Sequence, residues 1–180
     1  DVYKRQVEDL LKGIKDLAPI YFVTGNHELT SLAATQYQEL LALFQKYGVT
    51  DLDNDSVKLK KGGQSITLYG RQYFSQYLTD SLPIASDKDF DILLYHGSDN
   101  FKEIAPYHYD LILSGHAHGG IVRLPIWGGI FGNDGTFFPE YAGGEYTIGD
   151  ATLISSRGLG DASIPRFNNP PELVVIKLNP

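Results

Sequence analysis

The chain contains no cysteine and no methionine, and tryptophan occurs once among its 180 residues. The absence of cysteine excludes disulfide bonds, thiolate metal sites and a cysteine nucleophile. Cations are also scarce, because 15 Lys and Arg stand against 22 Asp and Glu and give a net charge of −7. A nucleic-acid-binding surface is therefore not expected, since phosphate backbones are held by clustered cations. The sequence also lacks the run of about 18 apolar residues that a membrane-spanning helix needs.

What is present is typical of a globular domain. Hydrophobic residues make up 42% of the chain and charged residues 21%. A chain of 180 residues is long enough for one domain with its own hydrophobic core.

The first residues, DVYKRQ, are unusual. The chain starts at Asp1 rather than at methionine, and codons for this segment resemble a transposon end that is ligated on in sequencing libraries. We predict that residues 1–6 are an adaptor scar and that residues 7–180 form a single domain. The alternative is that the segment is the genuine, charged start of a helix.

Hydrophobic periodicity predicts alternating helices and strands, which indicates an α/β fold. Helical spacing predicts helices at residues 7–17, 37–47 and 100–105. Short apolar runs predict buried strands at residues 20–24, 92–95, 111–114, 152–155 and 173–178. A hairpin is predicted where residues 57–61 and 65–69 flank Gly62-Gly63. Residues 125–146 are rich in glycine and aromatics and predict a long loop.

Four of the five histidines follow three of these apolar runs. They are His27, His96, His116 and His118, and Asn26 precedes the first of them. The carboxyl ends of strands in α/β sheets form one edge, so we expect these side chains at a shared rim. Imidazole and amide donors suit zinc, iron and manganese, which makes the rim a candidate metal site. The alternative for the last two histidines is a glycine-rich turn that exposes both.

The chain resembles the calcineurin-like metallophosphoesterase superfamily in three segments that occur in the family's order: Gly25-Asn26-His27-Glu28, Leu94-Tyr95-His96 and Gly115-His116-Ala117-His118-Gly119-Gly120. Residues 156–160 and 165–173 are similar to a bacterial phosphodiesterase branch of that superfamily. The resemblance implies a two-sheet α-β-β-α sandwich. It also implies a hydrolase that cleaves phosphate esters with two divalent metal ions, Mn, Fe or Zn.

The resemblance implies a role for each matching residue. Asn26, His96 and His116 match ligands of one metal, and His118 matches a ligand of the other. His27 matches a histidine that binds no metal, contacts the phosphate and donates a proton to the leaving group.

Three further residues are candidates on weaker grounds. Glu28 matches an acid that orients the neighbouring histidine, and its alternative is a solvated acid at a helix N-terminus. Arg157 and Arg166 are candidate phosphate contacts, although arginine at strand ends is more often paired within the fold. Trp127 and Phe137 lie in the predicted loop, which could cover substrate, face a membrane or pack on the core.

Two motifs of the family, Asp-x-His and Gly-Asp-x-x-Asp, do not occur in the chain. The predicted helix at residues 7–17 corresponds to the element that follows the second motif. We therefore expect an N-terminally truncated domain that lacks its first strands. Without the bridging aspartate, this chain is expected to bind at most one metal ion weakly and to be inactive, whereas the complete protein hydrolyses phosphodiesters.

The expected substrate is a phosphate-ester small molecule or a lipid-linked ester, and membrane association of the complete protein is left open. Its location, cytoplasmic, membrane-associated or exported, depends on residues upstream. The alternative function is a non-catalytic scaffold of the same fold, which is disfavoured because His27 and the His116–His118 pair are retained. A metallo-β-lactamase is disfavoured because Gly120 stands where that family has aspartate.

Overall fold

The computed structural model describes residues 2–73, 78, 82–86, 89–132, 135–160 and 165–179. Its helical elements are α1 (Val2–Ile14), α2 (Asn26–Thr30), α3 (Ala34–Lys46), η1 (Ser98–Asn100), α4 (Phe101–Ile104) and η2 (Ala105–Tyr107). Its strands are β1 (Ile20–Phe22), β2 (Val49–Asp51), β3 (Ser56–Lys61), β4 (Gln64–Arg71), β5 (Phe90–Gly97), β6 (Leu111–Gly115), β7 (Val122–Leu124), β8 (Gly128–Phe131), β9 (Gly144–Ile148) and β10 (Ala151–Ser155).

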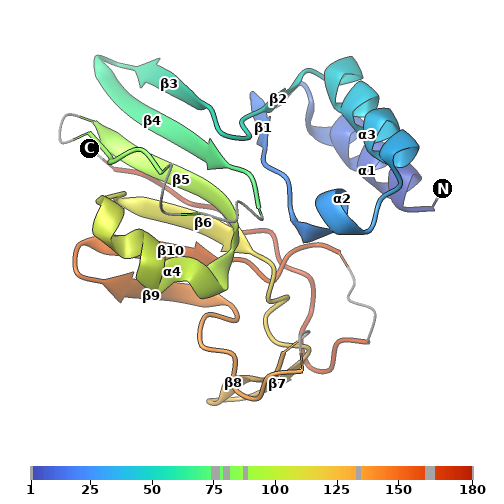
Figure 1. The fold of residues 1–180 in the computed structure, drawn as a ribbon, viewed down its shortest axis with the longest axis vertical. Helices are drawn as coiled ribbons and strands as arrows, with labels where there is room; N and C mark the ends of the chain where they lie inside the picture. The colour runs from blue at the N-terminus through green and yellow to red at the C-terminus, as the bar shows by residue number, and fades with distance from the viewer. Residues whose placement is uncertain are drawn as a thin grey trace.

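A six-stranded sheet forms the centre of the fold (Figure 1), with the strand order β3-β4-β5-β6-β10-β9. Strands β4, β5, β6 and β10 are parallel, whereas β3 and β9 are antiparallel edges. Parallel strands are usually covered on both faces, which explains the nearly continuous apolar runs of β5 and β6. Strands β1 and β2 form a separate parallel pair, and β7 and β8 form an antiparallel hairpin.

Three hydrophobic clusters join four layers in the order helix, sheet, sheet, helix. Helices α1 and α3 pack on β1 and β2, where the ring centroids of Phe22 and Phe44 lie 4.5 Å apart. Ile92 belongs to the cluster between β1 and the six-stranded sheet. Leu93 belongs to the opposite face, against Phe101 of α4, because successive side chains of a strand point to opposite sides. The predicted two-sheet α/β sandwich is confirmed.

Several predicted elements lie where the sequence indicates. Strands β1, β5, β6 and β10 overlap the predicted buried runs, and α3 ends before Gly48, whose φ is 70°. The β3–β4 hairpin turns at Gly62 and Gly63, with φ of 60° and 82°. Both angles fall in the left-handed region that a two-residue hairpin turn requires, and glycine adopts it without steric cost.

Other predictions were wrong. Residues 173–178 form no strand within the described chain, and Leu173 and Val175 are 77% and 87% exposed. An apolar run forms a strand only where a neighbouring strand pairs with its backbone, and the run by itself does not supply that neighbour. The predicted loop at residues 125–146 contains β8 and the start of β9, because their glycines obscure the period of two. Strand β2 was missed because three residues carry no readable pattern.

The N-terminal helix includes most of the predicted scar. Asp1 lies outside the described residues, and α1 begins at Val2. Lys4 Nζ lies 2.7 Å from Glu39 Oε2 on α3. The origin of residues 1–6 stays a prediction. No helix in the described ranges combines the length and apolar character that crossing a membrane requires.

Candidate metal centre

The candidate site lies where three strands end. Asn26 opens α2 just after β1, His96 lies near the carboxyl end of β5, and His116 follows β6. Strands β5 and β6 are parallel neighbours, so their carboxyl ends share one edge of the sheet. Strand β1 contributes from the adjacent layer (Figure 1). The sandwich thus brings together side chains from three distant parts of the sequence.

Asn26 and His96 are in direct contact. Asn26 Oδ1 lies 3.0 Å from His96 Nε2, although the two residues are 70 positions apart. Adjacent ligands about 2.1 Å from one octahedral ion are themselves about 3.0 Å apart, so this pair has the spacing of two ligands. The His96 and His116 ring centroids lie 5.2 Å apart, which places His116 beside the pair.

The His96 imidazole is held in its neutral form. Burial, together with repulsion from His116, His118 and His27, lowers the pKa of His96 to about 4. Asn26 Oδ1 can only accept, so Nε2 carries the proton of the neutral ring and the lone pair lies on Nδ1. Nε2 would bind a metal once this proton moves, whereas imidazolium has no lone pair at all.

The loop after β1 approaches His96 through a glycine. A Cβ atom on Gly25 would lie 3.0 Å from three ring atoms of His96, so a larger residue would displace the ring. Thr24, which is fully buried, anchors this loop. The Asp53 carboxylate accepts hydrogen bonds from the Thr24 backbone N–H at 2.9 Å and from its hydroxyl at 2.7 Å. Asp53 lies just past β2, so the partner strand of β1 fixes the loop.

The loop after β6 is strained. His116 and His118 have φ of 67° and 50°, in the left-handed region that non-glycine residues rarely adopt. Such conformations cost about 1–3 kcal/mol each and persist where the surroundings enforce them. Asn169, 3% exposed, supplies that support because its Nδ2 donates to the carbonyls of His118 at 2.7 Å and Gly120 at 2.9 Å. Sequence analysis did not single out Asn169, because nothing in its own segment indicates which carbonyls it contacts.

Tyr73 is a second site residue that sequence analysis missed. Its hydroxyl lies 3.3 Å from His116 Nε2, and its ring centroid lies 5.4 Å from that of His96. Burial, with the charge of Asp99, raises the pKa of Tyr73, so the hydroxyl keeps its proton and can donate to His116. Tyrosine occurs 12 times in the chain, and this one belongs to no motif.

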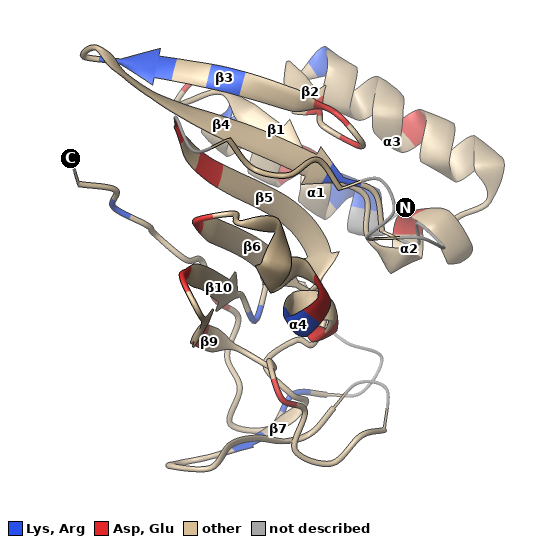
Figure 2. Ribbon diagram, turned by 60° about the vertical axis from the view of Figure 1, so that its left-hand side comes forward, with Lys and Arg blue, Asp and Glu red and all other residues tan. Residues whose placement is uncertain are grey.

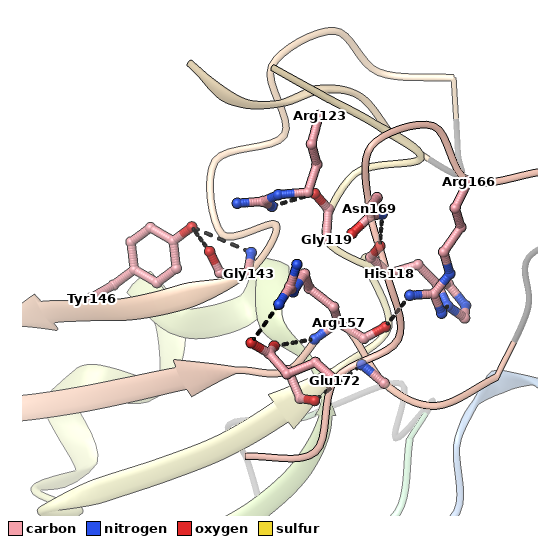
Figure 3. A network of polar contacts seen from close by, with 11 residues as sticks. His118, Gly119, Arg123, Gly143, Tyr146, Arg157, Arg166, Asn169 and Glu172 are labelled. Carbon is pink, nitrogen blue, oxygen red and sulfur yellow. Dashed lines mark hydrogen bonds and ion pairs between the residues drawn. The ribbon is translucent and has the colours of Figure 1, made fainter. Parts of the chain in front are cut away.

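His118 faces an arginine (Figure 3). Arg166 Nη2 lies 3.1 Å from His118 Nδ1, and the same guanidinium donates to the carbonyls of Arg157 and Gly160. A guanidinium can only donate, so Nδ1 accepts and the proton of neutral His118 lies on Nε2. A metal at His118 would therefore require the guanidinium or this proton to move.

The two candidate phosphate-binding arginines differ in their surroundings (Figure 3). Arg157 Nη2 lies 3.0 Å from Glu172 Oε1, and its backbone N–H donates to the same carboxylate. Arg157 thus serves the fold as an ion pair. Arg166 is placed at His118 because Phe167 exchanges backbone hydrogen bonds with β7 and its preceding residue Ile121.

His27 and Glu28 lie on the first turn of α2. His27 is exposed, and Ser31 Oγ lies 3.1 Å from its Nδ1, so Nε2 is the nitrogen that can meet a substrate. Glu28 Oε2 accepts a hydrogen bond from the Gly25 backbone N–H at 2.9 Å. Glu28 thus closes the N-terminal turn of the helix and positions the loop.

The donor set fits a divalent ion only in part. Asn26 and His96 have the spacing of two ligands and His96 is neutral, as coordination requires. Within the described residues, however, no three His, Asp or Glu side chains converge tightly enough to form a metal cluster. All the gathered donors are uncharged.

Comparison with known proteins agrees with this geometry. Residues 1–120 match the family model described as calcineurin-like phosphoesterase. The uncharacterized protein YpbG of Bacillus subtilis is 28% identical over 166 residues, covering 89% of this chain and 58% of its own. Phosphodiesterase YaeI of Escherichia coli is 25% identical over 171 residues, which cover 94% of this chain and 62% of YaeI. The UDP-2,3-diacylglucosamine pyrophosphatase LpxG of Chlamydia trachomatis is 33% identical over 94 residues, which cover 48% of this chain and 28% of LpxG. The chain thus spans about three fifths of the first two relatives.

Proposed function

The chain belongs to the calcineurin-like phosphoesterase family, and we propose that its protein is a metal-dependent phosphoesterase that hydrolyses phosphodiesters. The observation that carries this proposal is the convergence of Asn26, His96 and His116 from three strand ends, with Asn26 Oδ1 3.0 Å from His96 Nε2. A phosphodiesterase and a pyrophosphatase among the relatives support a hydrolase acting on phosphate esters.

In this proposal Asn26, His96 and His116 hold one divalent ion, Mn, Fe or Zn, and His118 contributes to a second in the complete protein. When bound, paired ions lower the pKa of a water and neutralise the charge of the phosphate. The chain as given gathers only neutral donors, so we expect it to bind one ion weakly and to turn over substrate poorly by itself.

His27 is the proposed proton donor. It lies at the start of α2 beside the proposed ligand Asn26, and the contact of its Nδ1 with Ser31 leaves Nε2 for the substrate. Imidazole titrates near neutral pH, which suits protonation of a leaving alkoxide. Arg166 lies next to His118 and donates to backbone carbonyls, whereas the Glu172 carboxylate balances the charge of Arg157. Arg166 is therefore the better placed cation for a phosphate oxygen.

The proposed substrate is a phosphodiester, either soluble or lipid-linked. A lipid-linked substrate is supported by the chlamydial relative, whose name specifies a diacylated UDP-sugar. A non-catalytic scaffold is the competing function. It predicts that the complete protein hydrolyses no phosphodiester, with or without added metal.

The test uses the chain and a chimera in which the N-terminal segment of YaeI precedes it, assayed on an aryl and an alkyl phosphodiester with added Mn. We expect little hydrolysis from the chain and metal-dependent hydrolysis from the chimera. His27→Ala in the chimera should lower turnover of the alkyl ester by roughly 10²–10⁴, with metal content unchanged. The aryl ester should lose less, because its leaving group needs no proton.

His116→Ala is the matched variant for the metal, since it should remove bound metal and activity together. A chimera that binds metal but hydrolyses neither ester would establish the scaffold. Equal losses for the two esters in His27→Ala would assign His27 to phosphate binding instead of proton donation.

A further inference from the structure

The contact between Arg166 and His118 conflicts with the role of His118 as a metal ligand. Arg166 Nη2 lies 3.1 Å from His118 Nδ1, and a guanidinium can only donate. Nδ1 therefore uses its lone pair for this contact, and Nε2 carries the proton of the neutral ring. Neither nitrogen then offers a lone pair to an ion. In this arrangement His118 does not fit the second metal that the resemblance implies for it.

The backbone holds the Arg166 guanidinium in place (Figure 3). Nη1 donates to the Arg157 carbonyl at 2.9 Å, and Nη2 also donates to the Gly160 carbonyl. The next residue, Phe167, forms a parallel bridge with Val122 at the start of β7. The position of the guanidinium is therefore set by the pairing of two backbone segments.

The segment that carries Arg166 also supports the backbone of His118. Asn169 Nδ2 donates to the His118 carbonyl at 2.7 Å, and β7, which pairs with Phe167, directly follows the histidine loop. Residues 166–169 thus hold both the ring of His118 and its backbone, whose φ is 50°. A contact supported in this way fixes which ring nitrogen carries the proton as well as where the ring lies.

A phosphate group would compete with His118 for the guanidinium. Guanidinium makes two parallel hydrogen bonds to a phosphate of opposite charge, whereas a neutral imidazole nitrogen accepts only one. Arg166 and His118 are both partly exposed, so an anion can reach them. When the guanidinium turns to a phosphate, the ring proton can move through solvent from Nε2 to Nδ1, which leaves the lone pair on Nε2.

We propose that Arg166 is a positioning residue that withholds His118 from metal until a phosphate group binds the guanidinium. Phosphate binding and metal binding at His118 then strengthen each other by the same factor, as linkage requires. The inference rests on the proposed function, because it takes a phosphate as the ligand of Arg166 and a metal as the ligand of His118.

The experiment follows the ring nitrogens of His118 by 15N NMR, at about pH 8, where free imidazole is neutral. Dimethyl phosphate is the probe anion, and sodium chloride at equal ionic strength is its control. In the metal-free chain, dimethyl phosphate should change the shift of Nδ1, which loses the hydrogen bond that it accepts. Zinc alone should leave both His118 nitrogens unchanged, whereas zinc with dimethyl phosphate should shift Nε2.

Arg166→Met removes the guanidinium and keeps a side chain of similar length. In this variant Nδ1 should already have the shift that dimethyl phosphate produces in the wild type. Zinc should bind His118 roughly tenfold or more tightly without any anion, because it no longer competes with a charge-assisted hydrogen bond. Dimethyl phosphate should bind more weakly by a similar factor.

Arg5→Met is the matched control, since it removes the same charge elsewhere. Arg5 is exposed on α1, which lies well away from β7 in Figure 1 and in Figure 2, so the His118 signals should match those of the wild type. Circular dichroism should be the same for all three proteins. The wild-type titrations decide the matter even if Arg166→Met does not fold.

Three results would overturn the inference: zinc that shifts His118 Nε2 of the wild type without an anion, an Nδ1 shift that dimethyl phosphate does not change, or a response to chloride equal to that to dimethyl phosphate. The inference and the proposed function can fail separately. If His118 responds as expected and the chimera hydrolyses no diester, only the proposed function fails. If the chimera hydrolyses diesters and His118 ignores dimethyl phosphate, only the role of Arg166 fails.

Discussion

The His96 ring packs against Gly25 on one side and against His116 and Tyr73 on another, and it contacts Asn26 through Nε2. Because the ring is packed this closely, a larger residue at a neighbouring position such as Gly25 would displace it. It also excludes water, which explains why burial is the main cause of the low pKa of His96.

We predict that His96 makes stability pH-dependent. Its pKa is about 4 in the folded protein and about 6.5 in an unfolded chain, so the unfolded state takes up the proton first as pH falls. The unfolding free energy should therefore drop by up to about 3 kcal/mol between pH 6.5 and pH 4. Urea unfolding of wild type and His96→Gln across this window measures the difference. Parallel curves for the two proteins would contradict the prediction.

We predict that Gly25→Ala weakens metal binding roughly tenfold or more. The new Cβ would lie 3.0 Å from the His96 ring, although the backbone angle at Gly25, −101°, suits alanine. Calorimetric titration with Mn or Zn measures the affinity. Gly13→Ala is the control, because a Cβ added at Gly13 would meet nothing within 4 Å. Gly13 lies in helix α1, where alanine should raise the unfolding free energy by about 0.5–1 kcal/mol. An unchanged affinity in Gly25→Ala would mean that the ring can move without loss.

At the scale of elements, short connections fix the site. The loop after β1 depends on β2, a strand of three residues that positions Asp53 for Thr24. The loop after β6 depends on Asn169, which lies 49 positions beyond Gly120. Asp53 lies outside the segments that carry the resemblance. Asn169 lies inside one of them, residues 165–173, but that similarity does not indicate which carbonyls it contacts.

We predict that Asp53→Ala lowers the unfolding free energy by about 1–3 kcal/mol and also weakens metal binding. The change leaves the buried Thr24 N–H and hydroxyl without their acceptor, and it releases the loop that carries Asn26. Asp53→Asn keeps one acceptor oxygen and should lose less on both counts. Urea unfolding and metal titration of the three proteins decide this. Equal losses in both variants would show that the carboxylate charge, and not the hydrogen bond, matters.

At the scale of the whole molecule, the protein has four layers, and the candidate metal centre lies where loops from its two sheets meet. Helices α1 and α3 cover β1 and β2, while α4 covers the far face of the six-stranded sheet (Figure 1). The proposed ligands follow strands of both sheets, so an ion that bound them would link the layers across the sandwich.

We therefore predict that Mn or Zn raises the thermal midpoint of the chain. An ion that binds only the folded state adds about 2.7 kcal/mol at 100 times its dissociation constant, which corresponds to roughly 5–10 °C for a domain of this size. Scanning calorimetry with increasing metal measures the shift, and His116→Ala should abolish it. Tight binding of two ions per chain would show that the ligand set is larger than we propose.

The sequence by itself determined the fold class, the central strands and the residues of the rim. Buried strands and glycine-histidine loops are local patterns, since period and turn chemistry act over a few residues. Tertiary structure decided which groups support them. Asp53, Tyr73 and Asn169 reach the site only through the pairing of strands and loops far apart in the chain. The same holds for the predicted strand at residues 173–178, because a strand needs a partner that its own sequence cannot supply.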